Sequence, residues 1–355
     1  MNVRAFKYLS PIISMLAITL SLYAGSYWSF FALFYAFFLI PMLELFLPAS
    51  EENLSRTEEE VMKKERIYDY MVWAIVPAQY LMMALFLYRV QQPQWATWEI
   101  FGFITAYGIS CGVFGINVAH ELGHRNTAWE QFLSKLLLLT SLYLHFFIEH
   151  NRGHHKHVST DEDPASSKRN ESLYAFWIRS VRDSWLSAWK LEQQRLEKTG
   201  QPVYSLHNEM LRFQFIQLGF MAAIAILFGP WVMLYYLGAA TIGFLLLETV
   251  NYIEHYGLRR RKIEDAYYEK VMPIHSWNSN HPVGRLMLFE LSRHSDHHYM
   301  ANRKYQILRH FDESPQMPTG YPGMMVLSLF PPLWFKVMNA QIDRYKETQQ
   351  GVDLA

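Results

Sequence analysis

The stretch IFGFITAYGISCGVFGINVAHELGH, which runs from Ile100 to His124, decides how the chain folds. From Ile100 to Ala119 it is free of charged side chains, and it is long enough for a helix to cross a bilayer. His120 and His124 follow directly, four positions apart, so both imidazoles lie on one helical face. We therefore expect a membrane protein that carries metal-ligand side chains at one membrane surface.

Apolar residues gather in blocks along the rest of the chain. Hydrophobic residues make up 51% of the 355 positions while charged residues still make up 18%, which suggests blocks rather than an even spread. We predict an all-α integral membrane protein of one domain, with six transmembrane helices and a cytoplasmic cap for two metals. The six windows lie at about 8–25, 28–47, 71–90, 100–119, 211–228 and 231–250, and the cap comprises 120–210 and 251–355.

Basic residues near the window ends set the predicted orientation. The loops near Ser26, 91–97 and Gly229 carry no Lys or Arg, whereas basic residues gather before the first window and between the second and third. By the positive-inside rule, the N-terminus and the cap are expected on the cytoplasmic side. These basic residues are Arg4, Lys7, Arg56, Lys63, Lys64 and Arg66.

The apolar segment from Gln131 to Phe147 is shorter than a membrane span and contains Lys135 and His145. If it crossed the membrane, the histidines before and after it would face opposite surfaces. We therefore expect this segment to be re-entrant or interfacial and to pack beneath the histidines.

Composition excludes several classes of protein. The net charge is zero and no basic run is interleaved with aromatic residues, so we expect no nucleic-acid partner. Cys111 is the only cysteine, which excludes an intrachain disulfide, a cysteine-rich zinc site and a thiolate-bound iron centre within this chain.

Histidine is the residue type that points to chemistry, because nine of the 15 histidines fall in four clusters. In a regular α-helix His150 and His154 share a face while His155 points away, so this motif can serve two metals. The three histidines of the HSDHH motif fall on one narrow face. The nine clustered residues, the predicted catalytic and metal-binding set, are His120, His124, His150, His154, His155, His255, His294, His297 and His298.

Nine imidazoles are too many for one metal ion but suit two ions with four or five each. The HExxH pattern alone also occurs in zinc proteases, and imidazole suits iron, zinc, copper or nickel. Structural zinc usually closes with four ligands, so an all-histidine pair with more ligands is typical of a catalytic site. We favour two non-haem iron ions, because oxygen activation needs a redox metal.

Four carboxylates beside the clusters are candidates for accepting the second N–H group of a metal-bound imidazole. They are Glu121, Glu149, Glu254 and Asp296. The remaining histidines stand outside the regular spacing, and we expect capping or hydrogen-bonding roles for them. They are His145, His157, His207, His275, His281 and His310.

The motifs resemble those of the membrane-bound alkane monooxygenases, within the superfamily of histidine-box desaturases and hydroxylases. The matching stretches are HELGHR from His120, EHNRGHHKHVSTDEDPAS from Glu149, NYIEHYGL from Asn251 and LSRHSDHHYMANRKYQILRH from Leu291. The NYIEHYG stretch separates alkane hydroxylases from ordinary fatty acid desaturases. Hydropathy along nearly the whole chain fits the family as well.

This resemblance implies that the nine histidines bind iron and that one oxygen atom of O2 enters a terminal C–H bond of a medium-chain alkane. It implies electrons from rubredoxin, supplied by an NADH-dependent rubredoxin reductase, and a place in the bacterial cytoplasmic (inner) membrane. The chain has no CxxC pair and no GxGxxG fingerprint, so these proteins are expected to be separate. We expect no flavin, haem or NAD on this chain.

Two further expectations concern how substrate and electrons reach the metals. An apolar slot inside the spans is expected to hold the alkane by shape, lined by residues such as Phe34, Phe37, Phe38 and Phe103. Basic residues near the histidines are candidates for steering an acidic electron carrier, although such a run is as often a topology signal. They are Arg152, Lys156, Arg259, Arg260, Arg261 and Lys262.

Three alternatives remain at this stage. A methyl-aromatic (xylene-type) hydroxylase has similar histidine motifs, and a membrane desaturase or hydroxylase of acyl chains shares three of them. A metal transporter would need its ligands within the spans along a permeation path, whereas here they lie beyond the span ends.

Overall fold

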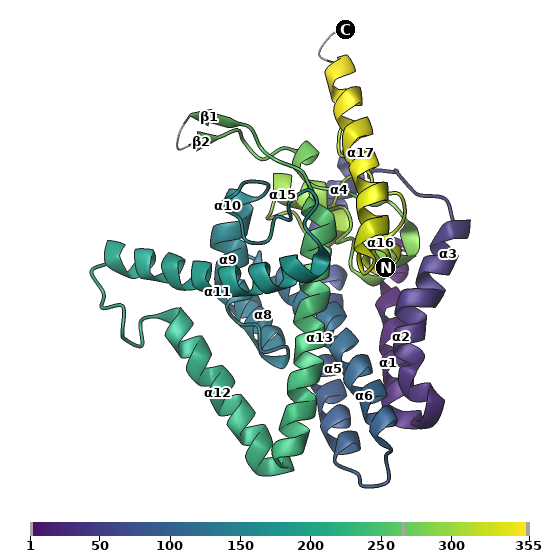
Figure 1. Ribbon diagram of the computed structural model, residues 1–355, viewed down its shortest axis with the longest axis vertical. Coiled ribbons are helices and arrows are strands. Elements are labelled where there is room, and N and C mark those ends of the chain that lie inside the picture. The colour runs from purple at the N-terminus through teal and green to yellow at the C-terminus, as the bar shows by residue number, and fades with distance from the viewer. Residues whose placement is uncertain (1–2, 265–266, 353–355) are drawn as a thin grey trace.

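The computed structural model describes residues 3–264 and 267–352. Six helical segments in this part of the chain are long and apolar enough to cross a membrane, as Figure 1 shows in its lower half. The predicted helical membrane fold with six candidate spans is therefore confirmed. The spans are Ala5–Ala24, Ser26–Phe46, Ile67–Val90 (α5), Thr97–Gly123, Glu209–Phe228 (α12) and Pro230–His255 (α13). The first span contains η1 (Val3–Leu9) and α1 (Ser10–Ala24), and the second contains η2 (Ser26–Phe30), α2 (Phe31–Phe34), η3 (Tyr35–Leu39) and α3 (Ile40–Phe46). The fourth contains α6 (Thr97–Ser110), η4 (Cys111–Ile116) and α7 (Asn117–Gly123).

The fourth and sixth spans continue beyond their apolar windows. Hydropathy falls after Ala119 and Val250, whereas the helices end at Gly123 and His255. Two of the histidine motifs therefore lie on continuous helices that extend into the cap. A helix fixes the positions of their side chains better than a loop does.

Glycine marks the tight turn between the last two spans. Gly229 adopts a φ of 93°, a region that other residues rarely adopt, and Pro230 occupies the first turn of α13. The chain therefore reverses direction within two residues, and α12 diverges from α13 above this hairpin (Figure 1).

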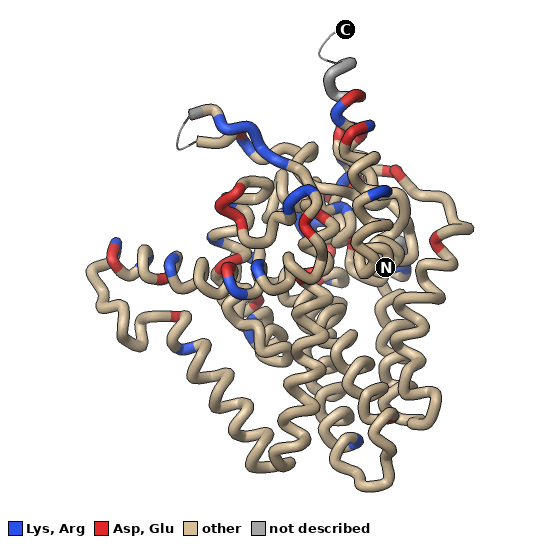
Figure 2. The backbone as a smooth tube through the Cα atoms, viewed as in Figure 1, with Lys and Arg blue, Asp and Glu red and all other residues tan. Residues whose placement is uncertain are grey.

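The cap lies at one end of the bundle and carries most of the charged residues (Figure 2). Below it the spans are almost free of Lys, Arg, Asp and Glu, as the bilayer interior requires. The cap elements are α4 (Arg56–Lys64), α8 (Ala128–Thr140), α9 (Phe146–Glu149), η5 (His150–His154), α10 (His155–His157), α11 (Leu173–Lys198), β1 (Lys262–Glu264), β2 (Tyr267–Tyr268), η6 (Pro273–His275), α14 (Pro282–Met287), α15 (His294–Tyr299), η7 (Tyr305–Ile307), α16 (Tyr321–Ser328) and α17 (Pro331–Val352).

The apolar segment from Gln131 to Phe147 forms no span. α8 has 13 residues, too few to cross about 30 Å of hydrocarbon, and it packs against α7 and α5. The chain then turns at Leu142, whose φ is 53°, and enters α9 directly before His150. The segment thus dips into the bundle, where the Thr140 carbonyl accepts a hydrogen bond from Tyr236 at 2.6 Å, and returns to the cap side, so the histidine motifs before and after it meet.

The main core lies where the fourth span packs against α13. Aromatic rings fill this contact: Phe86 stacks on Tyr107 with 4.7 Å between centroids, and both lie beside Tyr236. The fourth span is the most enclosed, with 61% of its apolar window buried, whereas α12 has 11%. The histidines of α7 therefore stand at the end of the best-packed span of the bundle.

Candidate metal centre

All nine predicted histidines come together in two adjacent groups at the cap end of the bundle. Within each group the ligand nitrogens all lie within 4.8 Å of one another, and most of the side chains are buried. The five-histidine group consists of His120, His124, His150, His155 and His297, and the four-histidine group of His154, His255, His294 and His298.

The five-histidine group joins α7, the segment 150–155 and α15. The Nε2 atoms of His120 and His297 are 2.8 Å apart, and those of His297 and His155 are 3.1 Å apart. His150 Nε2 lies 3.1 Å from His155 Nε2 and 3.0 Å from His124 Nε2. The nitrogens thus form a continuous chain of close neighbours that face a common centre.

The four-histidine group joins η5, α13 and α15. His298 Nε2 lies 2.8 Å from His294 Nε2 and 3.2 Å from His154 Nε2. His255 Nε2 lies 3.4 Å from His294 Nε2. His255, the last residue of α13, thus completes this group. The other three histidines come from the second motif (His154) and from the last motif (His294 and His298).

These separations suit a metal ion in each group. Two nitrogens bound at about 2.1 Å to one ion and at right angles to each other are about 3 Å apart. Neutral imidazole nitrogens that meet without an ion gain only one weak hydrogen bond per pair, because each ring has a single donor. The donor set therefore fits two transition-metal ions, and imidazole is a usual ligand of iron.

A π-helical turn determines how the second motif divides between the groups. In η5 the backbone N–H of His155 donates to the carbonyl of His150, five residues earlier. This wider turn brings His150 and His155 to the same side, and His154 goes to the other group. The prediction that His150 and His154 share a face was therefore wrong, because it assumed regular α-helical spacing.

The last motif is divided as well. His294 and His298, one helical turn apart in α15, belong to the four-histidine group, whereas His297 belongs to the five-histidine group. The sequence placed all three on one narrow face, and that face lies against both groups. α15 and the segment 150–155 thus each contribute to both metal positions.

Burial keeps most of these imidazoles neutral, which is the form that binds metal ions. It lowers the pKa of His124 to about 3, and burial together with neighbouring imidazoles lowers the pKa of His150 and His297 well below the usual value. His154 differs, because burial acts to lower its pKa but the carboxylates of Asp163, Glu149 and Glu248 together outweigh burial and raise it. Asp163 therefore adds negative charge to the four-histidine group.

Two carboxylates contact the four-histidine group. Asp163 Oδ2 lies 2.9 Å from His154 Nδ1, the nitrogen on the outer side of the ring, and also accepts a hydrogen bond from Ser166. Glu254 Oε2 lies 3.1 Å from His294 Nε2, the nitrogen that faces the other imidazoles. Glu254, predicted as an outer partner, thus stands on the inner side of the group, while Asp163 takes the outer position.

The other three predicted carboxylates have different partners. Glu121 accepts a hydrogen bond from Arg125 at 2.6 Å, and Asp296 accepts from Arg303 at 2.8 Å. Glu149 accepts from Ser187 at 3.5 Å and lies buried in a small polar pocket beside His150. Sequence reasoning missed Asp163, although it stands nine residues after His154 in a quoted motif. Only the fold, which turns the chain back at 158–163, reveals that contact.

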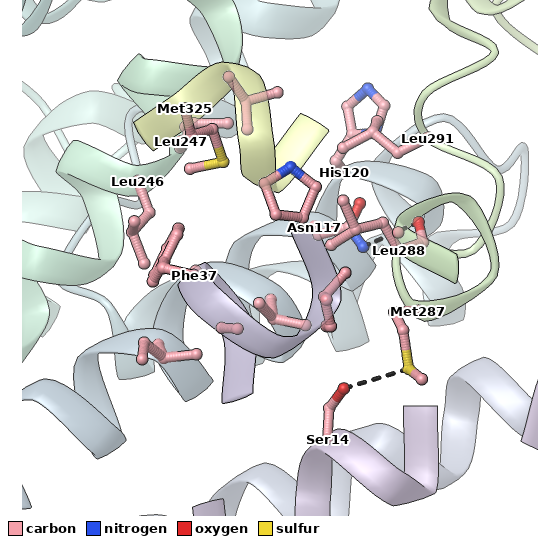
Figure 3. Close-up of a pocket in the computed structure, with 18 of the residues that line it drawn as sticks. Ser14, Phe37, Asn117, His120, Leu246, Leu247, Met287, Leu288, Leu291 and Met325 are labelled. Atoms are coloured by element: carbon pink, nitrogen blue, oxygen red, sulfur yellow. Dashed lines mark hydrogen bonds between the residues drawn. The ribbon is translucent and has the colours of Figure 1, made fainter. Parts of the chain in front are cut away.

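An apolar cavity opens below both histidine groups (Figure 3). It contains about 990 Å³ of empty space including its mouth. His120 and His150 of one group, and His294 of the other, form its upper wall together with Glu254. The deeper wall is almost entirely apolar and includes Ile18, Ala32, Phe37, Ile109, Gly112, Val113, Leu246 and Met325.

Only one of the aromatic residues proposed for the slot lines this cavity. Phe37 points into it (Figure 3), whereas Phe34 and Phe38 are about half exposed on the outside of the second span. Phe103 is buried but packs against Trp95 at 5.3 Å. The helical spacing of these residues does not reveal which side of the span faces inward, so three of the four were misplaced.

The six remaining histidines stay outside both groups. Most have local hydrogen-bonding partners: His157 pairs with Glu162, His275 with Glu269, His281 with Ser279 and His310 with Asn280 and Asp312. His207 is exposed, and His145 is buried beside Tyr143 in the polar pocket.

The candidate residues for steering an electron carrier fall into two sets. Arg152 pairs with Glu192 and Glu209, and Arg260 donates to backbone carbonyls of Lys156 and Glu269. Arg259 lies 3.8 Å from Asp161. The residues with exposed charges are Lys156, Arg261 and Lys262, on or beside the hairpin β1–β2 that projects from the cap (Figure 2), and of these Arg261 also pairs with Glu269 at 3.1 Å.

The fold and the site define a class: a multi-pass membrane protein with a histidine-rich site for two metal ions above an apolar cavity. The fatty acid desaturase family profile matches residues 93–328. Alkane 1-monooxygenase 2 of Pseudomonas aeruginosa is 38% identical over 97% of this chain and 94% of its own length. Alkane 1-monooxygenase 1 of the same organism is 40% identical over 90% and 84%.

The chain belongs to the alkane 1-monooxygenases of the fatty acid desaturase family. A more distant relative is the hydroxylase component of xylene/toluene monooxygenase of Pseudomonas putida. It is 28% identical over 68% of this chain and 63% of its own length.

Proposed function

We propose that this chain is a non-haem di-iron monooxygenase that hydroxylates the terminal methyl group of medium-chain n-alkanes with O2. The observation that carries the proposal is the apolar cavity, which ends at imidazoles of both histidine groups. A substrate without polar groups suits such a cavity, because apolar contact alone contributes about 0.8 kcal/mol per buried methylene.

One iron ion would be held by His120, His124, His150, His155 and His297, and the other by His154, His255, His294 and His298. When bound, the two ions supply the redox chemistry that activates O2 and oxidises a strong C–H bond. Asp163 would keep the imidazole of His154 in the tautomer that binds through Nε2.

The chain's own residues would position the alkane and exclude water. Ile109, Gly112 and Val113 lie on the span that leads to His120, so a chain lying along them points its end at the metals. The polar side chains deep in the cavity, Ser14 and Tyr35, have their hydroxyls at Met287 Sδ, which leaves an apolar wall for the substrate. Binding by shape alone would present a terminal methyl group to the site.

Electrons would come from rubredoxin on the cytoplasmic side of the bacterial inner membrane. Basic residues around the first three spans support this orientation. The exposed side chains of Lys156, Arg261 and Lys262 suit an acidic carrier, which they would attract over about 8 Å at physiological salt.

Methyl-aromatic oxidation is the second candidate function, because the xylene/toluene relative matches two thirds of the chain. The greater similarity to the alkane 1-monooxygenases, at 38–40% identity, favours alkanes.

The test is oxygen-dependent turnover of octane and dodecane by purified protein of known iron content, with rubredoxin, its reductase and NADH. We expect primary alcohols, identified by mass spectrometry, in proportion to about two irons per chain. Val113→Phe should shorten the cavity and lower turnover of dodecane more than that of octane, by about four-fold per excluded methylene. Leu81→Phe, at a side chain 72% exposed on α5, is the matched control.

Two outcomes would contradict the proposal. Oxidation of xylene but not of octane by the iron-loaded protein would favour the methyl-aromatic reaction. An alkene formed from an acyl chain would favour a desaturase.

A further inference from the structure

A groove in the membrane region lies between α12 and α13, away from the metal centre. It has about 600 Å³ of empty space including its open side, and its walls include Leu142, Leu218, Met221, Leu237 and Phe244. α12 diverges from α13 above the Gly229 hairpin (Figure 1), and only 11% of its apolar window is buried. Because water is absent from the bilayer interior, hydrocarbon must cover this inner face.

One polar group in the groove lacks a partner. The side-chain nitrogen Nε2 of Gln214 is shielded from solvent and has no hydrogen-bond partner among the described residues. A shielded amide donor left unpaired costs about 1 to 3 kcal/mol, more in hydrocarbon. The groove therefore calls for an occupant that is mostly hydrocarbon but carries a hydrogen-bond acceptor at the level of Gln214.

The depth of Gln214 identifies that acceptor. Glu209, at the start of α12, pairs with Lys135 at 2.5 Å and with Arg152 at 3.4 Å, and these charges mark the headgroup level. Gln214 follows five residues later, about 7.5 Å deeper along the helix. The headgroup layer is about 5 to 8 Å thick on each side, so Gln214 lies where the ester carbonyls of phospholipids lie.

The upper end of the groove contacts the turn that leads to the metal centre. Gln217 Oε1 accepts a hydrogen bond from the backbone N–H of Leu144 at 3.0 Å. Phe244 stacks on Tyr143 with 5.0 Å between the ring centroids. This turn enters α9, which ends where His150 begins the second histidine motif. An occupant of the groove thus supports the segment that holds three metal-ligand candidates.

We propose that this groove binds one phospholipid, with an acyl chain between α12 and α13 and its ester carbonyl accepting a hydrogen bond from Gln214 Nε2. The lipid fills the space left by the splayed helix and stabilises the turn at 141–145. The proposal rests on the groove and its amide, not on the reaction that the metal centre catalyses.

The experiment counts phospholipids retained by the full-length protein after delipidation in detergent and addition of phosphatidylglycerol at a limiting ratio, by native mass spectrometry. Wild type should retain one. Thr241→Trp fills the groove from an exposed lining position and should retain none. Ile226→Trp adds the same bulk at a side chain 82% exposed elsewhere on α12 and should retain the lipid as wild type does.

An ether-linked phospholipid tests the hydrogen bond itself, because it lacks the ester carbonyl. Wild type should bind the ester lipid about five-fold more tightly than the ether lipid, and Gln214→Leu should bind both equally. This comparison needs no groove-filling variant, so it holds even if Thr241→Trp fails to fold.

Three results would overturn the proposal. Equal retention by wild type and folded Thr241→Trp would show that the lipid is elsewhere. Equal affinity of wild type for ester and ether lipid would show that Gln214 does not bind the ester carbonyl. A dimer, or a bound n-alkane, found in place of the lipid would assign the groove to a different occupant.

Discussion

The two histidine groups lie side by side, but their surroundings differ. Among the residues that the structure describes, no hydrogen bond or ion pair joins a carboxylate to an imidazole of the five-histidine group. The four-histidine group is contacted by Asp163 at His154 and by Glu254 at His294. The group with fewer imidazoles thus has two carboxyl groups beside it, and the negative charge of Asp163 stabilises a metal cation in a buried site. Two sites built from one residue type are therefore not equivalent.

The largest effect is expected from removing one imidazole of the four-histidine group, because that group has only four. His255→Ala leaves three imidazoles in the four-histidine group, so we expect about one iron per chain instead of two and activity reduced by at least about 100-fold. His124→Ala leaves four imidazoles in its group and should keep more iron. Iron analysis of both purified variants checks the comparison, and equal iron loss would show that the two groups are equally well supplied.

A smaller effect on metal binding is expected from changing Asp163, the carboxylate on the outer side of the His154 ring. Asp163→Asn keeps the shape of the contact with His154 but removes the charge, so the affinity for one of two irons should fall by about 10- to 100-fold. Competition with a chelator, followed by iron analysis, measures this. A variant that releases both irons at the wild-type rate would show that Asp163 has no part in holding the metal.

Glu254 lies on the inner side of the four-histidine group, whereas Asp163 lies on its outer side, so the two carboxyl groups should affect iron differently. Since it faces the same nitrogen as the neighbouring imidazoles, Glu254→Gln should lower the affinity for one iron by about 10-fold and change the spectrum of the iron-loaded protein. Glu130→Gln, at a buried carboxyl that accepts a hydrogen bond from Trp73, is the control. Full iron content and full activity in Glu254→Ala would remove Glu254 from the site.

The smallest effect on the metals is expected from changing Glu121, the carboxyl group that follows His120 of the five-histidine group. Glu121 pairs with Arg125, which also binds Asp69, so Glu121→Gln should keep two irons. It should lower the free energy of unfolding by about 1 to 3 kcal/mol, because a buried charged hydrogen bond is weakened. Thermal unfolding in detergent with iron analysis separates the two effects. Loss of iron would show that this group also depends on a carboxylate.

The six candidate spans, the nine clustered histidines and the position of the 131–147 segment could be predicted from the sequence. Hydropathy over about 20 residues and motif spacing depend on local sequence, which makes them readable without a structure. The division of the nine histidines could not be predicted, because it depends on the π-helical turn at His150–His154. Asp163 and the true cavity wall could not be predicted either, since each depends on contacts between distant segments.

The order of the histidines along the chain has a consequence for biosynthesis. Four of the five-histidine group precede position 160, whereas three of the four-histidine group come at His255 or later. His120 and His297 are 177 positions apart, which the ribosome needs about 10 to 35 s to translate at 5 to 20 residues per second. Between the synthesis of His155 and that of His255, a nascent chain presents four imidazoles of one site and a single imidazole, His154, of the other. The five-histidine group is therefore the first to have most of its imidazoles available for a metal ion during synthesis.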